Sequence, residues 1–234
     1  ENSGTGTKVG VLSASDPDNA SAGIPLASDL VLWLPFNDGA VIDLSPAANA
    51  THLHGEPASV PDRFGNPDSA LSFDAVEAWI EANSVAEDLT EGASFSYWMK
   101  TTNLSREAIF SINKPVESQA EENVLISFVE PLTGGNNASI SIRYNTGDQI
   151  AQTPISDGQW HHVVYSIDEQ NGELYLDGEL HLNVDSSVLF NPDNQISIGM
   201  ELDRGDDSKV TEQSNFFNGI VDDLRVYNRK ITRE

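Results

Sequence analysis

The chain has 234 residues, enough for one large β-sandwich or two small domains, and its 38% hydrophobic content suffices for a packed core. Acidic residues outnumber basic ones by 37 to 12, and the net charge of −25 argues against nucleic acid, anionic membrane surfaces and sulfated polysaccharides as partners. The same excess favours bound divalent cations, although a salt-adapted surface would show the same bias. There is no cysteine, which excludes disulfides, zinc–thiolate sites and thiol nucleophiles.

The first 28 residues differ in character from the rest. One short strand, residues 8–15, precedes an Asp-Pro-Asp turn, which is too little to fold alone. The segment resembles the opening of a cadherin-like repeat, and the residues that match it are Glu1, Gly6, Thr7, Asp16 and Asp18. The resemblance implies a strand of a repeating stalk, with Asp16 and Asp18 at a calcium site between repeats. An ordinary linker is the open alternative.

From Asp29 onward the pattern is strand after strand, with turn signals at short intervals and no sustained helical period. The predicted strands are Leu30–Phe36, Ala70–Phe73, Ala78–Glu81, Phe95–Lys100, Ala108–Ile112, Val124–Val129, Ser139–Tyr144, His161–Ile167, Gln195–Gly199 and Gly219–Tyr227. A hairpin is expected over residues 173–182, where alternating apolar residues flank Asp177-Gly178. Short helical turns are expected at Val85–Leu89 and after Arg229. This is an all-β pattern, and it predicts a two-sheet antiparallel β-sandwich or jelly roll over residues 29–234.

Several phrases occur together in the order typical of one family. They are Trp33–Gly39, Ala70–Asp74, Phe95–Lys100, Asp157–Val163, Leu176–Gly178 and Asn218–Tyr227. Together they resemble the laminin-G-like, concanavalin A-like lectin domains, above all the bacterial ones and their relatives the pentraxins. The resemblance implies a concanavalin A-like jelly roll that binds carbohydrate.

The resemblance to pentraxins also implies a calcium (Ca2+) site. The matching residues are Glu122, Asn123, Glu201, Leu202, Asp203 and Gln213, with Leu202 acting through its carbonyl. Calcium takes six to eight oxygen ligands, and Glu201 and Asp203 lie two apart, so both point to one side of an extended strand. The alternative is an acidic surface loop without metal.

Further polar residues lie near this loop, or in two sequence segments that lie close together in the folded domains of this family. Arg204, Asp206, Asp207 and Asn215 are predicted to select a sugar by hydrogen bonding, and Asp206 and Asp207 could instead serve a second ion or be solvated. Asp38 and Asp222 are candidates for another structural cation, although Asp38 is as well explained by turn capping.

The aromatic and histidine residues have structural interpretations. Trp33, Trp98 and Trp160 are predicted to pack in the core, whereas Trp79 could face either way. His161 and His162 point to opposite faces of a strand, so we expect one buried and one exposed side chain and no shared metal. His52 and His54 share a face, but no third ligand completes a zinc or copper site.

Catalysis has no support in the sequence. Hydrolases of the concanavalin A-like fold need paired carboxylates, commonly Glu-x-Asp-x-Glu on one strand, and this spacing is absent, as are a nucleophile elbow, a phosphate loop and a zinc-protease helix. No segment is apolar enough to cross a membrane, and no signal peptide or transit pattern begins the chain, so we expect no membrane insertion and a piece of a longer protein.

The leading interpretation is a calcium-dependent, carbohydrate-binding lectin module of a secreted or cell-surface bacterial adhesin. It would bind glycans or cell-surface polysaccharide and adjoin neighbouring repeats. Two alternatives stay open: a carbohydrate-binding module of a secreted polysaccharide-degrading enzyme, and a calcium-stabilised structural or protein-binding domain.

Overall fold

The computed structural model describes residues 29–89, 92–113, 123–144, 147–184, 190–204 and 211–231. For Asn123, Asp203, Arg204, Thr211 and Glu212 it describes the backbone alone. The cadherin-like segment 1–28, with Asp16 and Asp18, lies outside these ranges, as do Glu122, Asp206 and Asp207.

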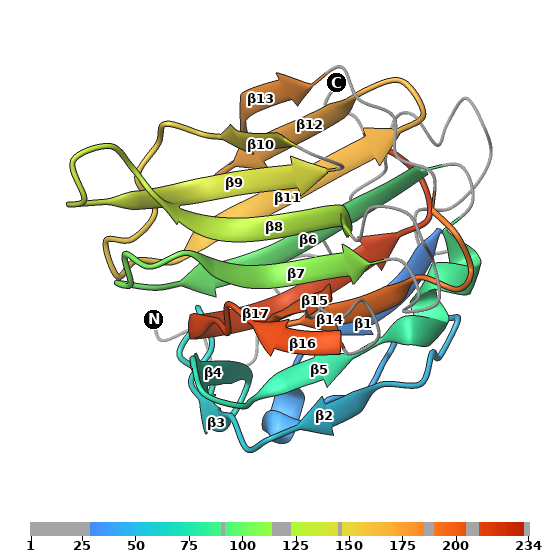
Figure 1. Cartoon of the computed structure of the whole chain (residues 1–234). Helices are drawn as coiled ribbons and strands as arrows, with labels where there is room; N and C mark the ends of the chain where they lie inside the picture. Colours follow the sequence, from blue (N-terminus) through green and yellow to red (C-terminus); the bar gives the residue numbers. More distant parts are fainter. Residues whose placement is uncertain are drawn as a thin grey trace, which may run out of the picture.

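Strands make up most of the described residues (Figure 1). They are β1 Leu30–Leu34, β2 His52–His54, β3 Ala58–Val60, β4 Ala70–Asp74, β5 Trp79–Glu81, β6 Gly92–Lys100, β7 Glu107–Asn113, β8 Asn123–Pro131, β9 Ala138–Tyr144, β10 Gly147–Ile150, β11 His161–Asp168, β12 Gly172–Leu176, β13 Glu179–Val184, β14 Gln195–Ile198, β15 Glu201–Arg204, β16 Thr211–Ser214 and β17 Asn218–Tyr227. Two 3₁₀ turns, η2 Asn37–Gly39 and η3 Asn83–Asp88, interrupt them.

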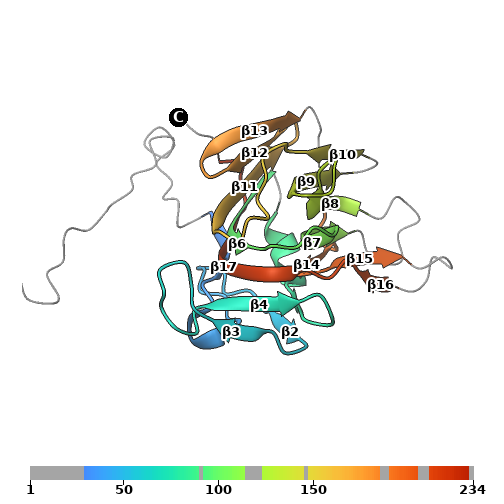
Figure 2. The ribbon, with the colours of Figure 1, turned by 90° about the vertical axis from the view of Figure 1, so that its left-hand side faces the viewer.

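The strands form two large antiparallel sheets that face each other, as predicted (Figures 1 and 2). The eight-stranded sheet runs β13-β12-β11-β6-β17-β4-β3, with β1 also paired to β17, and the seven-stranded sheet runs β10-β9-β8-β7-β14-β5-β2. A separate hairpin, β15-β16, projects on the far side of the seven-stranded sheet (Figure 2).

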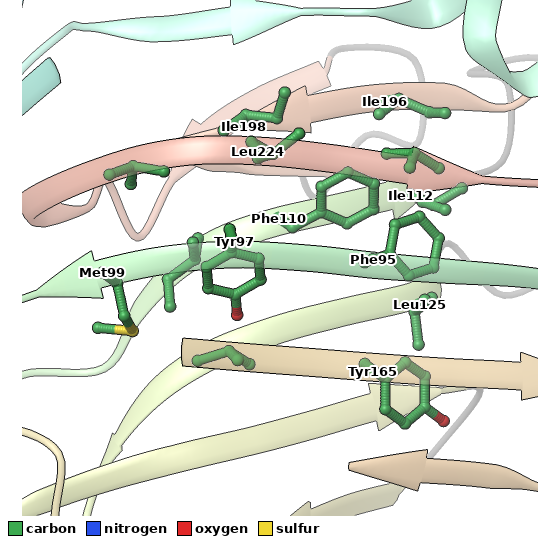
Figure 3. Packing of buried hydrophobic residues seen from close by; sticks show 14 of the residues in the cluster. Phe95, Tyr97, Met99, Phe110, Ile112, Leu125, Tyr165, Ile196, Ile198 and Leu224 are labelled. Carbon is green, nitrogen blue, oxygen red and sulfur yellow. The ribbon is translucent and has the colours of Figure 1, made fainter. Parts of the chain in front are cut away.

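The core lies between the two sheets because alternate residues of each strand turn inward. The inward residues Phe95, Tyr97 and Met99 of β6 and Phe110 and Ile112 of β7 all belong to this core, where the ring centroids of Phe95 and Phe110 lie 4.4 Å apart (Figure 3). One polar contact crosses this core: the hydroxyls of Tyr97 and Ser127 lie 2.8 Å apart. Burial raises the pKa of the Tyr97 phenol, so the phenol stays neutral and the pair stays a neutral hydrogen bond.

β17 occupies the centre of its sheet. Leu224–Tyr227 pairs with β1, Asn218–Val221 pairs with β4, and the opposite edge pairs with β6. The register to β6 shifts between Asp222 and Arg225, where Asp223 has a positive φ of 52°. This bulge turns the two aspartates and Arg225 toward the outer face of the eight-stranded sheet.

Every predicted strand is present, and no end differs from the prediction by more than three residues. The Asp177-Gly178 turn is confirmed, with φ values of 51° and 81° that fit a primed hairpin turn, and η3 confirms the helical turn near Val85. Residues 230 and 231 form no helical turn. The short strands β2, β3, β10, β15 and β16 were not predicted. Among the described residues, no helix is long and apolar enough to cross a membrane.

Candidate ligand-binding site

The loop that the sequence marked as functional begins as a hairpin on the outer face of the seven-stranded sheet. β15 packs against β7, and the backbone N–H of Ala108 donates to the carbonyl of Asn215 over 2.7 Å. A small cluster of Trp79, Met200, Leu202 and Phe216 packs the root of the hairpin onto β5. The hairpin root is therefore part of the folded sandwich.

Glu201 is the first residue of β15, and it is only 1% exposed. The amide Nδ2 of Asn215 donates to its Oε2 over 2.6 Å, and Nη1 of Arg143 lies 3.9 Å from its Oε1. A buried carboxylate needs such partners because burial without them is strongly unfavourable. The structure thus brings together two residues that the sequence singled out, Glu201 and Asn215, and adds Arg143.

Arg143 belongs to a network of charges stacked over one aromatic ring. It donates from Nε and Nη2 to the two carboxylate oxygens of Asp148, over 2.6 and 3.0 Å. Arg106 bonds both Glu130 and Asp148. The two guanidinium groups lie 3.9 Å (Arg106) and 5.3 Å (Arg143) from the ring centroid of Phe128. We call Arg106, Glu130, Arg143, Asp148 and Glu201 the Arg143 cluster.

The arginines of the cluster keep the carboxylate of Asp148 ionised. Hydrogen bonds from Arg143, followed by those from Arg106, lower the pKa of Asp148. The side chains of Arg106, Arg143 and Asp148 remain 25%, 30% and 26% exposed, so their edges can reach a ligand. Planar, ionised groups of fixed orientation are suited to hydrogen bonding with hydroxyls and amides.

Further polar atoms lie buried on this face. Ser141 pairs with Phe128 in the sheet register, and its hydroxyl has no hydrogen-bond partner within the described ranges. Nη2 of Arg106 and Nδ2 of Asn113 are also buried without a hydrogen-bond partner in the described part of the chain. Buried polar atoms of this kind normally bind ordered water or a ligand.

The predicted calcium ligands are described only in part. Leu202 and Gln213 lie opposite each other in the β15–β16 ladder, whereas Glu201 lies opposite Ser214. Opposite residues share a face and adjacent ones alternate, so the exposed Gln213 lies on the Leu202 face and not beside the Glu201 carboxylate. Asn123, Asp203 and Arg204 are placed by backbone alone, and the described residues contain no group of three or more carboxylate or histidine side chains able to hold a metal.

The two candidates for another cation, Asp38 and Asp222, have different surroundings. Asp38 is exposed in η2, while Asp222 is buried and accepts a hydrogen bond from Nη1 of Arg63 over 2.5 Å. Nη2 of Arg63 also donates to Asp223, 3.1 Å away. Arg63 therefore already neutralises the Asp222 carboxylate.

The tryptophans differ from the sequence prediction. Trp33, Trp98 and Trp160 are only partly buried, whereas Trp79 is 7% exposed. Trp33 and Trp98 lie on strands whose other face fills the core, so they turn to the outer face of the eight-stranded sheet. There the ring of His162 stacks on Trp98 at 4.8 Å, and Arg63 lies 5.1 Å from the same ring. The expectation of core packing was wrong because hydrophobicity alone does not say which face of a strand is inside.

The two adjacent histidines have different partners, as strand alternation predicted, but both are partly buried. His161 contacts Asp177 and Asp157 at 2.8 and 3.1 Å, while His162 lies 2.9 Å from the hydroxyl of Ser96. His54 stacks on Trp79 at 4.0 Å and contacts Glu81, so it covers the most buried tryptophan.

Sequence reasoning missed Arg106, Arg143, Asp148 and Phe128. A signal was available: Ser139, Ser141 and Arg143 alternate with Ala138, Ile140 and Ile142 along β9, which marks a polar outer face. Arginine and lysine together number 12 in the chain, so two arginines on one aromatic ring is a notable concentration.

Comparisons with known proteins agree with this architecture. A family model described as the concanavalin A-like lectin/glucanases superfamily matches residues 74–234. No curated protein matches the sequence.

Solved structures share the fold at low sequence identity. Domain 4 of AbnA, a GH43 extracellular arabinanase from Geobacillus stearothermophilus solved in complex with arabinotriose, is 16% identical, with a TM-score of 0.61, and the match covers 87% of this chain and 94% of that one. The binding domain of botulinum neurotoxin DC in complex with SialylT is 13% identical, with a TM-score of 0.60 over 89% of this chain and 50% of that one. The binding domain of Paraclostridial Mosquitocidal Protein 1 is 15% identical, with a TM-score of 0.60, and the match covers 89% of this chain and 51% of that one.

Proposed function

The chain belongs to the concanavalin A-like lectin and glucanase superfamily, and on that basis we propose that it is a carbohydrate-binding module whose ligand lies over the Arg143 cluster. The observation that carries the proposal is the partly exposed Arg143–Asp148 pair beside the buried Glu201 and above Phe128. Sugar hydroxyls donate and accept at once, and this cluster presents arginine donors next to carboxylate acceptors.

The ligands of the structural neighbours support a glycan. The arabinanase domain was solved with arabinotriose and the toxin binding domain with SialylT. We extend this ligand class to the present chain because the cluster presents donors and acceptors side by side, as sugar hydroxyls require. The net charge of −25 argues against sulfated glycans.

We propose binding without catalysis. Glycoside hydrolysis needs a carboxylic acid whose pKa is raised so that it can protonate the leaving group. In the Arg143 cluster the pKa of Asp148 is lowered, because Arg143 and Arg106 favour its ionised form. Burial does raise the pKa of Glu107, to about 7, but its oxygens accept hydrogen bonds from Asn103 and from the backbone of Asn218 inside the protein.

Calcium dependence belongs to the same proposal. Its support is the acidic excess and the placement of Glu201 and Asp203 two apart on β15. A bound ion would neutralise carboxylates of the hairpin and hold its oxygens in place. Calorimetric titration of calcium into the wild type and Glu201→Gln tests this: binding lost or weakened in the variant supports the site, and equal binding in both contradicts it.

The parent protein would be exported, either as a surface adhesin or as a polysaccharide-degrading enzyme that carries this domain. The second candidate is favoured by one observation, the match to 94% of domain 4 of an extracellular arabinanase. Both candidates use the same glycan-binding face.

The decisive experiment measures glycan binding on an array, followed by calorimetry with arabinotriose and a sialylated trisaccharide. Arg143→Lys keeps the charge beside Glu201 but loses the planar fork, so affinity should fall at least about tenfold without loss of the fold. Arg225→Lys is the matched control, since Arg225 also stacks on an aromatic ring (Trp33, 5.2 Å) and pairs with an aspartate, on the opposite sheet. Equal losses in both variants, or no glycan binding by the folded wild type, would contradict the proposal.

A further inference from the structure

Lys230 follows the last strand, and its side chain ends beside three residues of the β11–β12 hairpin. The Nζ atom contacts the side-chain Oδ1 of Asn171 and lies 3.3 Å from the Asn171 backbone carbonyl. It also lies 3.6 Å from Oδ2 of Asp168 and 4.0 Å from Oε1 of Glu173. The lysine side chain is 10% exposed, so these contacts are shielded from water.

We propose that Lys230 and Asn171 become joined by an intramolecular isopeptide bond. The nucleophile, Nζ of Lys230, contacts the oxygen of the Asn171 carboxamide, and the carbon to be attacked, Cγ, is bonded directly to that oxygen. The site depends on neither the glycan site nor calcium, because it lies on the eight-stranded sheet and uses other residues.

The backbone on both sides is fixed before any reaction. Asp168 and Asn171 close the turn: the N–H of Asp168 donates to the Asn171 carbonyl over 3.1 Å, and the N–H of Asn171 donates to Oδ1 of Asp168 over 2.9 Å. Beyond the turn, Gly172 packs so closely on Tyr165 that an added Cβ would lie 2.1 Å from the phenol oxygen.

The backbone on either side of Lys230 is also held by hydrogen bonds. The hydroxyl of Ser94 donates to the carbonyl of Arg229 over 2.8 Å, and the N–H of Ile231 bonds the hydroxyls of Ser94 and Ser166. Two reactants held in contact react as a unimolecular pair, which is the main requirement for amide formation without an enzyme.

The reaction balances with groups already present. Glu173 takes a proton from the lysine ammonium, and the neutral amine attacks Cγ of Asn171. Glu173 returns that proton to the departing amide nitrogen and takes up the second proton that the attacking Nζ gives up. The Nζ–Cγ bond forms, the Cγ–Nδ2 bond breaks, and ammonia leaves, so no oxidant or co-reactant is needed. Asp168 stays ionised, since backbone hydrogen bonds from Asn171 and Gln170 outweigh burial and lower its pKa. It orients the lysine, while Glu173 carries the proton.

The test is the intact mass of the purified, folded chain. We expect the wild type to weigh less than its sequence by one ammonia and Lys230→Ala to have its full sequence mass. Lys100→Ala is the control and should keep the deficit. A protease digest of the wild type should yield a branched peptide that joins residues 171 and 230, and Glu173→Gln should remain folded by circular dichroism but lose or slow the deficit.

A succinimide at Asn171-Gly172 would also release ammonia, but it would persist in Lys230→Ala and give no branched peptide. A folded wild type with its full sequence mass, or a deficit that survives in Lys230→Ala, overturns the proposal and leaves Lys230 as an ordinary ion-pair partner.

Discussion

The side-chain amide of Asn215 donates to Oε2 of Glu201 over 2.6 Å, and so links the residue after β16 to the first residue of β15. The bond closes the base of the hairpin at a carboxylate that is almost wholly buried. We expect Asn215→Ala to lower the free energy of unfolding by about 1–3 kcal/mol, because the carboxylate loses a donor it cannot replace with water. Urea unfolding followed by tryptophan fluorescence measures this. Asn137→Ala, at an exposed position, is the control, and equal midpoints for both variants would refute the role assigned to the bond.

The buried carboxyl group of Glu107 should give the folding stability of the protein an unusual dependence on pH. Burial raises its pKa from 4.5 to about 7, so in this range the folded chain holds a proton that the unfolded chain has released. The free energy of unfolding should therefore fall as the pH rises from 4.5 to 7, by roughly 3 kcal/mol at most from this group. Chemical denaturation across this range, with Glu107→Gln as the comparison, measures the slope. A variant whose slope equals that of the wild type would show that other groups cause it.

The adjacent histidines should titrate on opposite sides of 6.5. Although burial opposes it, the hydrogen bonds that His161 donates to Asp177 and Asp157 raise its pKa, whereas burial lowers the pKa of His162. The stabilisation from protonated His161 is complete below pH 6.5 and disappears as the pH rises through its folded pKa. Its aspartate partners are about half exposed, which limits the effect to roughly 1 kcal/mol. Histidine ring resonances followed by NMR test the order, and Asp177→Asn should lower the pKa of His161.

Arg63 fastens the loop between β3 and β4 to the bulge in β17. It donates to Asp222 and Asp223, and Asp222 is only 3% exposed. Arg63→Ala leaves a buried carboxylate without its cation, and we expect it to lower the free energy of unfolding by about 3–5 kcal/mol. Arg225→Ala, at a more exposed ion pair, should lower it by less than about 1 kcal/mol. Equal losses measured by thermal unfolding would contradict the distinction.

Local sequence pattern was enough for the strands and for the Asp177-Gly178 turn, because both follow from rules that span only a few residues. Local pattern was not enough to place the tryptophans. Trp98 lies in an apolar run whose buried residues are Phe95, Tyr97 and Met99. Which of the two alternating sets of residues faces the core depends on where the opposing sheet lies, and a local pattern does not contain that information. Motif spacing singled out Glu201 as a calcium ligand, and Asn215 was named as a residue that selects a sugar; both roles stay predictions. Spacing did not reveal Arg143, which reaches Glu201 only because β9 and β15 are brought together on one face of the folded sheet.

β1 and β17 pair so that Leu30 lies opposite Tyr227, and the N–H of Asn228 donates to the carbonyl of Asp29 over 2.9 Å. The polypeptide therefore enters and leaves the sandwich at neighbouring points. A force that pulls residues 29 and 228 apart would act on the end of this antiparallel ladder, along its hydrogen bonds. The hydrogen bonds would then break one after another from that end, and not all together as they would under shear. Resistance to a pulling force must then come from β6, the neighbour on the other edge of β17.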